Sequence, residues 1–511
     1  MAVVAARLRR GSIGVDIGGA LNLVGALLRW LGLAFLFPAA VALGYGEPVW
    51  PFLLSGALTS GSGFGLEQVT QGRERVGARE GFLIVALTWL LVAFFVSLPY
   101  IFSGEDQLGR PLDAYFEGMS GMTTTGATTL TDVEGLSRSL AMWRQFSQWL
   151  GGMGIIVLAL AVLPRLRVGG RQLMESELPG PEIEKLTASI RDTARRLWLL
   201  YLGLTLAQIL ALAVVGWAGL DERMNLFEAV AHAFTTMPTG GFSTQARSIE
   251  AFSTASQWTI AVFMTLAGAN FALMYRAFVR LRPGALARDE EFRLYLGLLF
   301  LGSLVLAATL WSADILAGEG AIRHAVFQAV SITTTTGYAS TDFNEWLVAA
   351  PLAAMVLIAL MFPGGSAGST AGSIKVVRHL LIGRLLRREL DQTVHPEVVS
   401  VLRVNGAVVD ERTVRAVIAF VLLYVGIFVA GSLALLIESH RAGVAVSPFE
   451  AIAAAATTLG NVGPAFGFAG PMGSFEPFSD LSTGIMIALM WLGRLELVPV
   501  IVLFTRAYWR A

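Results

Sequence analysis

The chain has 511 residues, of which 55% are hydrophobic and only 14% are charged, and its mean hydropathy is +0.65. Soluble domains carry about 25% charged residues, so this composition indicates an integral membrane protein. The formal net charge is zero, which gives no reason to expect a nucleic-acid partner. The chain has no cysteine, which excludes disulfides, thiolate metal sites and cysteine nucleophiles.

Ten apolar stretches are predicted to cross the membrane, because a helix needs about 20 apolar residues to do so. In chain order they are 21–44, 48–65, 81–101, 145–164, 197–219, 258–275, 294–312, 346–362, 416–437 and 481–504. The second is short and rich in glycine, and the last contains two charged residues, Arg494 and Glu496.

Arginines cluster in alternate segments between these stretches. The clusters are at 7–10, 73–79, 165–196, 276–293, 378–415 and 506–510. Because cytoplasmic loops carry an excess of Lys and Arg, all six clusters are predicted to face the cytoplasm. Ten crossings then place both termini in the cytoplasm and the remaining loops outside.

Four of the external segments hold a short, semi-apolar stretch followed by residues rich in Thr, Asn and Gly. They are YFEGMSGMTTTGATT at 115–129, LFEAVAHAFTTMPTGGFST at 226–244, VFQAVSITTTTGYAST at 326–341 and PFEAIAAAATTLGNVGPAFG at 448–467. Near its start each has Phe followed by Glu or Gln. A glycine follows that Phe by 10 residues in the first and third segments and by 14 in the second and fourth. A unit of span, short helix, polar strand and span is thus repeated four times, with a period of about a hundred residues.

Non-helical backbone is tolerated at membrane depth only where protein buries it or where it lines a water-filled path. A short helix that enters from outside would aim its partially negative C-terminal end at the membrane centre. Carbonyls of four following strands around one axis can replace the hydration shell of a monovalent cation. The strands contain no Asp or Glu, which suits a weakly hydrated monovalent ion better than Ca²⁺ or Mg²⁺. An ordinary external turn would explain one such segment, but four matched copies favour an ion filter.

These segments, together with QWLGGMGIIVLALAVLP at 148–164 and ESELPGP at 175–181, resemble the TrkH/KtrB/HKT superfamily of cation transporters, and specifically its bacterial TrkH branch. The resemblance covers nearly the whole chain, and the two extra N-terminal spans fit that branch. It implies K⁺ as the transported ion, with no organic cofactor in this chain. It also implies a homodimer in the bacterial inner membrane, regulated by a cytosolic nucleotide-binding ring of the TrkA type.

The expected fold is an all-α integral membrane protein with four span–pore helix–filter strand–span repeats around one pore. Residues 1–70 form the two-span extension, and 71–170, 171–285, 286–395 and 396–511 form repeats 1 to 4. The resemblance assigns the filter to four triplets: Thr124, Thr125 and Gly126; Thr239, Gly240 and Gly241; Thr335, Thr336 and Gly337; and Asn461, Val462 and Gly463. The double glycine leaves the second register open by one residue, and the fourth triplet lacks the threonine. Glycine in all four triplets is the pattern associated with potassium preference in the superfamily.

The segment PGGSAGSTAGS at 363–373 is predicted to interrupt the second span of repeat 3, because each glycine costs a helix interior about 1 kcal/mol. A flexible linker would also explain it, but residues 374–386 resume a helical, basic pattern. We therefore expect an intramembrane gating loop below the filter, as in TrkH relatives. Its gate residues are Gly364, Gly365, Gly368 and Gly372, followed by Lys375, which either binds backbone carbonyls or faces the cytosol.

Arg494 lies near the middle of the last apolar stretch. An intramembrane charge costs about 2.5–3.5 kcal/mol on insertion scales and usually faces an interior or a cavity. Pairing with Glu496 is disfavoured, because helix neighbours two residues apart do not face each other. The position predicts an electrostatic barrier to cations below the filter, acting together with the glycine loop.

Two further functions stay in competition with gated potassium uptake. A secondary transporter of a small solute working by alternating access also uses repeats and broken helices, but it would normally show two inverted halves. A membrane enzyme is disfavoured, because the chain has no HExxH motif and no clustered carboxylates in the spans. Coupling of the flux to H⁺ or Na⁺ is left open.

Overall fold

The computed structural model describes residues 15–71, 77–161, 190–398 and 400–510. The ESELPGP motif, the basic cluster at 7–10 and most of the cluster at 165–196 lie outside these residues. The described part is almost entirely helical. Two short strands, β1 (Arg403–Val404) and β2 (Ala407–Val408), pair as an antiparallel hairpin.

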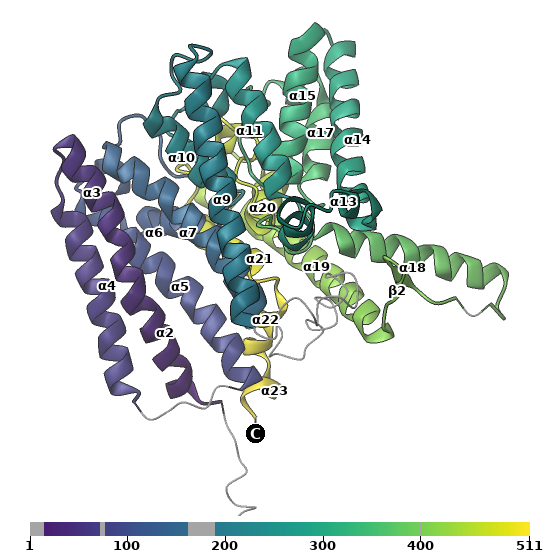
Figure 1. Ribbon diagram of the computed structural model, residues 1–511, viewed down its shortest axis with the longest axis horizontal. Helices are drawn as coiled ribbons and strands as arrows, with labels where there is room; N and C mark the ends of the chain where they lie inside the picture. Colours follow the sequence, from purple (N-terminus) through teal and green to yellow (C-terminus); the bar gives the residue numbers. More distant parts are fainter. Residues whose placement is uncertain (1–14, 72–76, 162–189, 399, 511) are drawn as a thin grey trace, which may run out of the picture.

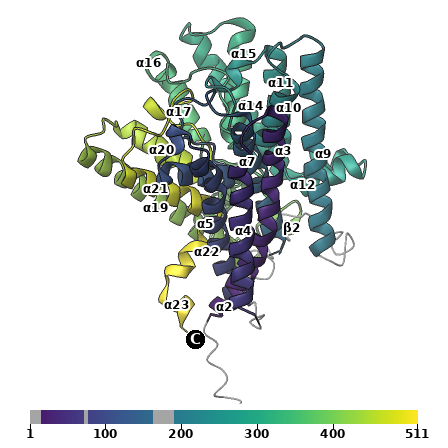
Figure 2. The same ribbon diagram turned by 90° about the vertical axis from the view of Figure 1, so that its left-hand side faces the viewer.

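The N-terminal part is a helical hairpin that packs against the first long helix of the remaining chain. It consists of α2 (Ile17–Leu31), η1 (Gly32–Phe35), α3 (Leu36–Tyr45) and α4 (Trp50–Val69), and it lies on α5 (Ala78–Phe102). These helices run side by side along one side of the protein (Figures 1 and 2). Glycines let α2 and α4 approach closely: a Cβ on Gly25 would lie 2.8 Å from the carbonyl oxygen of Gly63.

After this hairpin the same order of elements recurs four times: a long helix, a short helix, an extended segment and a second helix, which is broken in three of the four units. Unit 1 is α5, α6 (Pro111–Met122) and α7 (Arg138–Ala161). Unit 2 is α9 (Ile190–Trp217), α10 (Leu226–Thr236), α11 (Thr254–Ala267), α12 (Phe271–Met274) and η5 (Tyr275–Val279). Unit 3 is α14 (Glu290–Ser312), α15 (Gly318–Thr333), α16 (Trp346–Ala349), α17 (Pro351–Leu360) and α18 (Val376–Val394). Unit 4 is α19 (Glu411–Ala442), α20 (Pro448–Gly460), α21 (Asp480–Arg494), α22 (Val498–Ile501) and η7 (Val502–Phe504).

The four units close on one another around the short helices. Each short helix packs against the first helix of its own unit, as α6 does on α5, α10 on α9, α15 on α14 and α20 on α19. The second helix of a unit also reaches the short helix of the next: α7 contacts α10, α11 contacts α15, and α21 returns to α6. The helix α18 instead extends away from the body, next to the small hairpin (Figure 1).

Several predicted spans are broken rather than continuous. Within the described residues, five helices are long and apolar enough to cross a membrane, or seven if each bent pair is one span. The predicted span 258–275 bends by 102° between α11 and α12, and 481–504 bends by 112° after α21. The predicted span 346–362 is interrupted at Ala350, because a residue before proline disfavours helical backbone and Pro351 follows. The number of ten crossings therefore stays a prediction.

The C-terminal helix α23 (Arg506–Trp509) ends beside the start of α5 (Figure 1). The hydroxyl of Tyr508 donates a hydrogen bond of 2.8 Å to the carbonyl oxygen of Arg79. The basic segments at 73–79 and 506–510, which were predicted to share one side of the membrane, thus have their described residues next to each other.

Candidate functional site

The extended segment after each short helix begins with the same unusual backbone. The first residues of the four triplets, Thr124, Thr239, Thr335 and Asn461, have φ angles of 52°, 57°, 56° and 54°. Two residues later, Gly126, Gly241, Gly337 and Gly463 have φ angles of 85°, 77°, 82° and 112°. A residue other than glycine in this region costs about 1–3 kcal/mol and persists only where the surroundings enforce it. The four matching φ angles therefore show that one local backbone structure is repeated four times.

The middle residue of each triplet closes the end of its short helix in the same way. Its backbone N–H donates to the carbonyl oxygen five residues earlier, which satisfies an otherwise orphaned carbonyl at the helix end. The bonds are Thr125 to Ser120 (2.9 Å), Gly240 to Thr235 (2.8 Å), Thr336 to Ser331 (2.8 Å) and Val462 to Thr457 (2.9 Å). In backbone conformation, Gly241 rather than Gly240 is thus equivalent to Gly126.

The four triplets meet as a closed ring. A Cβ added to the glycine of any triplet would lie against the backbone carbonyl oxygen of the middle residue of a neighbouring triplet, and in three of the four pairs it would overlap that oxygen. The pairs are Gly126 with Gly240, Gly241 with Thr336, Gly337 with Val462, and Gly463 with Thr125. The ring therefore runs in chain order and returns to its start. Only glycine combines a positive φ with so close an approach of backbone to backbone.

The fourth triplet, which departs from the threonine pattern, is joined to the first by a side chain. The amide nitrogen of Asn461 donates to the hydroxyl of Thr125 at 2.9 Å and to the carbonyl oxygen of Met490 at 3.0 Å. Both Asn461 and Thr125 are fully buried. Asparagine at this position thus fixes triplet 4 both to triplet 1 and to α21.

A buried ion pair contacts the segments that follow triplets 1 and 2. The Nε of Arg144 is 3.0 Å from a carboxylate oxygen of Glu117, and neither side chain is more than 3% exposed. The other carboxylate oxygen accepts from the backbone N–H of Thr129 at 2.8 Å, on the segment after triplet 1. The guanidinium also donates to the carbonyl oxygen of Ser243 at 3.0 Å and lies 3.5 Å from the ring centroid of Phe242. The pair therefore joins the segments that follow two neighbouring triplets.

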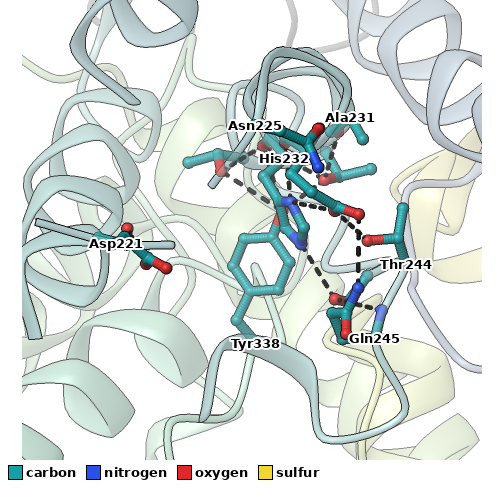
Figure 3. A network of polar contacts seen from close by, with 12 residues as sticks. Asp221, Asn225, Ala231, His232, Thr244, Gln245 and Tyr338 are labelled. Carbon is teal, nitrogen blue, oxygen red and sulfur yellow. Dashed lines mark hydrogen bonds and ion pairs between the residues drawn. The ribbon is translucent and has the colours of Figure 1, made fainter. Parts of the chain in front are cut away.

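A second polar network joins triplet 3 to unit 2 (Figure 3). Tyr338 directly follows Gly337, and its hydroxyl donates to the carbonyl oxygen of His232 at 3.2 Å and contacts the hydroxyl of Thr235. The ring of His232 contacts the hydroxyl of Ser243 at 3.0 Å through Nε2. Across the described residues, no group of three or more His, Cys, Asp or Glu side chains is placed to hold a metal ion. These polar side chains support the ring rather than forming a separate metal centre.

The predicted gating segment forms a compact loop between α17 and α18, and it packs against the triplets. The backbone N–H of Gly372 donates to the hydroxyl of Thr335 at 2.7 Å. The hydroxyl of Thr370 donates to the carbonyl oxygen of Met237 at 3.0 Å, at the end of α10. At the base of the loop, the N–H of Gly364 donates to the carbonyl oxygen of Ile374 at 2.9 Å.

The other predicted gate residues belong to the same loop. A Cβ on Gly365 would lie 2.6 Å from the carbonyl oxygen of Gly268, at the break after α11. Gly368 has a φ of +71° and lies beside Asn270. Lys375 donates from Nζ to the carbonyl oxygen of Ala371, which is one of the two placements that the sequence left open.

Arg494 ends α21 and reaches the same loop. It is only 3% exposed, and its guanidinium donates to the carbonyl oxygen of Thr370 at 2.9 Å. Its Nε and its second terminal nitrogen have no hydrogen-bond partner among the residues that the structure describes. Glu496 instead contacts Arg378, at 2.5 Å. The structure thus brings Arg494 and the glycine loop together, next to the ring.

Sequence reasoning missed three buried polar residues that hold the ring: Glu117, Arg144 and Gln148. Glu117 belongs to the Phe–Glu pattern of the first segment, which gives no sign of its pairing with Arg144. Arg144 and Gln148 are four residues apart on α7, so they share one face of that helix. Two polar residues on one face, at the entrance to an otherwise apolar stretch, are the signal that could have indicated their role.

The fold and the site together define a multi-pass, mostly helical membrane protein whose four units enclose a buried ring of backbone carbonyls. The chain matches the family described as "TrkH: Cation transport protein" over residues 57–510. It is 38% identical over 436 residues to the "Trk system potassium uptake protein TrkH" of Escherichia coli (strain K12), covering 85% of this chain and 86% of that protein. It is 36% identical over 497 residues to the protein of the same name from Halomonas elongata, covering 96% and 98%.

Its fold is similar to the crystal structure of the potassium transporter TrkH from Vibrio parahaemolyticus. The TM-score is 0.85 at 33% sequence identity, covering 97% of this chain and 100% of that chain. The protein therefore belongs to the TrkH family of cation transport proteins, as the resemblance of its motifs predicted, and it is a transport protein rather than an enzyme.

Proposed function

We propose that this protein takes up potassium ions across the bacterial inner membrane, through a selectivity filter formed by the triplets 124–126, 239–241, 335–337 and 461–463. The observation that carries the proposal is the closed ring, in which the middle-residue carbonyl oxygen of each triplet lies against the glycine of a neighbouring triplet. Rings of carbonyl oxygens replace the hydration shell of potassium. The names of the relatives, which are potassium uptake proteins, support the same ion.

The chemistry of the ring supports a monovalent ion. The triplets contain only Thr, Gly, Asn and Val, so they offer oxygen dipoles and no formal charge. Ca²⁺ and Mg²⁺ sites in proteins use carboxylates. A ring of neutral oxygens is therefore best matched to a cation that gives up its water easily.

The proposal includes a gate below the filter. The loop at 363–373 and Arg494 close the pathway on the inner side, where the loop is bonded to triplet 3 and Arg494 is bonded to the loop. A buried cationic group next to the pathway opposes the passage of another cation. Movement of the loop away from the ring would carry the Thr370 carbonyl away from Arg494 and open the path.

The remaining parts of the proposal follow the family. Residues 1–70 are an N-terminal extension, and 71–170, 171–285, 286–395 and 396–511 are four pore repeats around one pore. Both termini face the cytoplasm, two copies form a homodimer, and a cytosolic nucleotide-binding ring of the TrkA type controls the gate. The basic helix α18 begins at the gate loop, and its exposed C-terminal half offers a route for such control.

Flux into liposomes tests the proposal. Purified protein is reconstituted, and uptake of K⁺ or Rb⁺ is measured with and without competing Na⁺. We expect Rb⁺ uptake that excess K⁺ suppresses and that Na⁺ affects much less. A protein that moves no alkali cation, but exchanges a small organic solute across the same membrane, would instead support alternating-access transport.

A further inference from the structure

The side chain of Gln148 is hydrogen-bonded to the backbone of triplet 2 and of the residue that follows it. Gln148 lies on α7, in unit 1, and is fully buried. Its Nε2 donates to the carbonyl oxygen of Gly240 at 2.7 Å, and its Oε1 accepts from the backbone N–H of Phe242 at 3.2 Å. One amide thus makes two hydrogen bonds to the backbone on either side of Gly241, much as a neighbouring strand would.

These two hydrogen bonds explain the double glycine of triplet 2. At the position of Gly240, the other three triplets have Thr125, Thr336 and Val462. A Cβ on Gly240 would overlap the Oε1 of Gln148 and would lie 3.0 Å from its Nε2. The space that a side chain occupies in the other triplets is therefore filled here by an amide from another helix.

The hydrogen bonds of Gln148 also make the ring asymmetric. Within the described part of the chain, no hydrogen-bond donor reaches the carbonyl oxygens of Thr125, Thr336 or Val462, whereas that of Gly240 accepts from Gln148. A carbonyl held by a buried amide is less free to move toward a small ion than one held only by its own backbone. Sites work best when their ligands are held in position by a second layer of contacts.

We propose that Gln148 is a positioning residue that sets the preference of the filter for potassium over sodium. It holds the Gly240 carbonyl oxygen at the distance from the ion that suits K⁺. Triplet 2 then does not move inward to coordinate the smaller Na⁺. This inference rests on the proposed function, since it assumes that the ring is the filter.

The first test replaces Gln148 by methionine, which has a similar length and volume but cannot make either hydrogen bond. In liposomes we expect the Gln148→Met protein to take up K⁺ while its K⁺-over-Na⁺ preference falls roughly 10-fold, the scale of one net hydrogen bond. The control is Gln145→Met, because Gln145 is equally buried on α7 but makes no contact with the triplets that the structure records. It should keep the wild-type ratio. A wild-type ratio in Gln148→Met would overturn the inference.

The second test does not depend on the folding of that one variant. Gly240→Ala alone should reduce K⁺ uptake, because its methyl group collides with Gln148. Adding Gln148→Ala removes the collision, so the double variant should take up more K⁺ than Gly240→Ala. A double variant no better than the single one contradicts the inference. If the wild-type protein itself moves no K⁺, the proposed function fails; if it does and either test fails, only the role of Gln148 is lost.

Discussion

The backbone N–H of Gly372 donates a hydrogen bond of 2.7 Å to the side-chain hydroxyl of Thr335. Thr335 is the first residue of triplet 3 and has a φ of 56°, so its own position is set by the ring. Gly372 belongs to the loop that we propose as the gate. One buried hydrogen bond thus joins triplet 3 to the loop at 363–373, within a single unit of the fold.

This bond predicts the effect of Thr335→Val. Valine keeps the shape of threonine but leaves the N–H of Gly372 buried without an acceptor, which costs the closed loop about 1–3 kcal/mol. We expect basal Rb⁺ uptake to rise by roughly 5-fold or more when no regulator is present. The matched control is Thr333→Val, because the hydroxyl of Thr333 is buried and has no hydrogen-bond partner among the described residues. An equal rise in both variants would show that the bond is not the cause.

The contact between Arg494 and Thr370 leads to a second prediction. Arg494→Ala removes both the charge beside the proposed pathway and the hydrogen bond to the loop. Ion flux should therefore increase, measured as Rb⁺ uptake into liposomes. Arg494→Lys retains the charge and should give a flux between those of the wild type and the alanine variant. Unchanged flux in a well-folded Arg494→Ala protein would contradict the hypothesis that Arg494 is an electrostatic barrier to cations.

Gly126→Ser tests the ring itself. The serine Cβ would meet the carbonyl oxygen of Gly240, and the φ of 85° is unfavourable for any residue with a side chain. The carbonyls of triplets 1 and 2 must then move apart. We expect a weaker K⁺-over-Na⁺ preference, measured by Na⁺ competition against Rb⁺ uptake. An unaltered ratio would argue that Gly126 does not line the ion path.

The sequence was most informative where backbone geometry demands one residue type. Positive φ and close approach of backbones require glycine, and the spacing after Phe marked the glycines that meet this demand as candidates: Gly126, Gly241, Gly337 and Gly463. The residue two places earlier adopts an equally unusual φ in all four triplets. Asn461 is a residue type that favours this conformation, but the identity of Thr124, Thr239 and Thr335 does not reveal it.

Breaks in apolar helices were harder to predict, because hydropathy counts apolar residues and ignores residues that cap the start or end of a helix. The predicted span 258–275 is a single apolar run, yet Asn270 accepts a hydrogen bond from the N–H of Leu273 at 3.0 Å and begins a new helix there.

Contacts such as that of Gln148 with Gly240 join residues 92 positions apart. They depend on how the units pack, which no local pattern specifies.

The buried pair of Glu117 and Arg144 leads to the last prediction, which concerns stability. Removing one member of a buried pair leaves the other charge unpaired and costs about 3–5 kcal/mol, whereas replacing both by groups of similar volume is often neutral. Glu117→Gln and Arg144→Met should each lower the melting temperature of the detergent-solubilised protein. The double variant should be more stable than the sum of the two losses predicts, because it leaves no unpaired charge. Additive losses would show that the two side chains act independently, despite the 3.0 Å separation of their charged atoms.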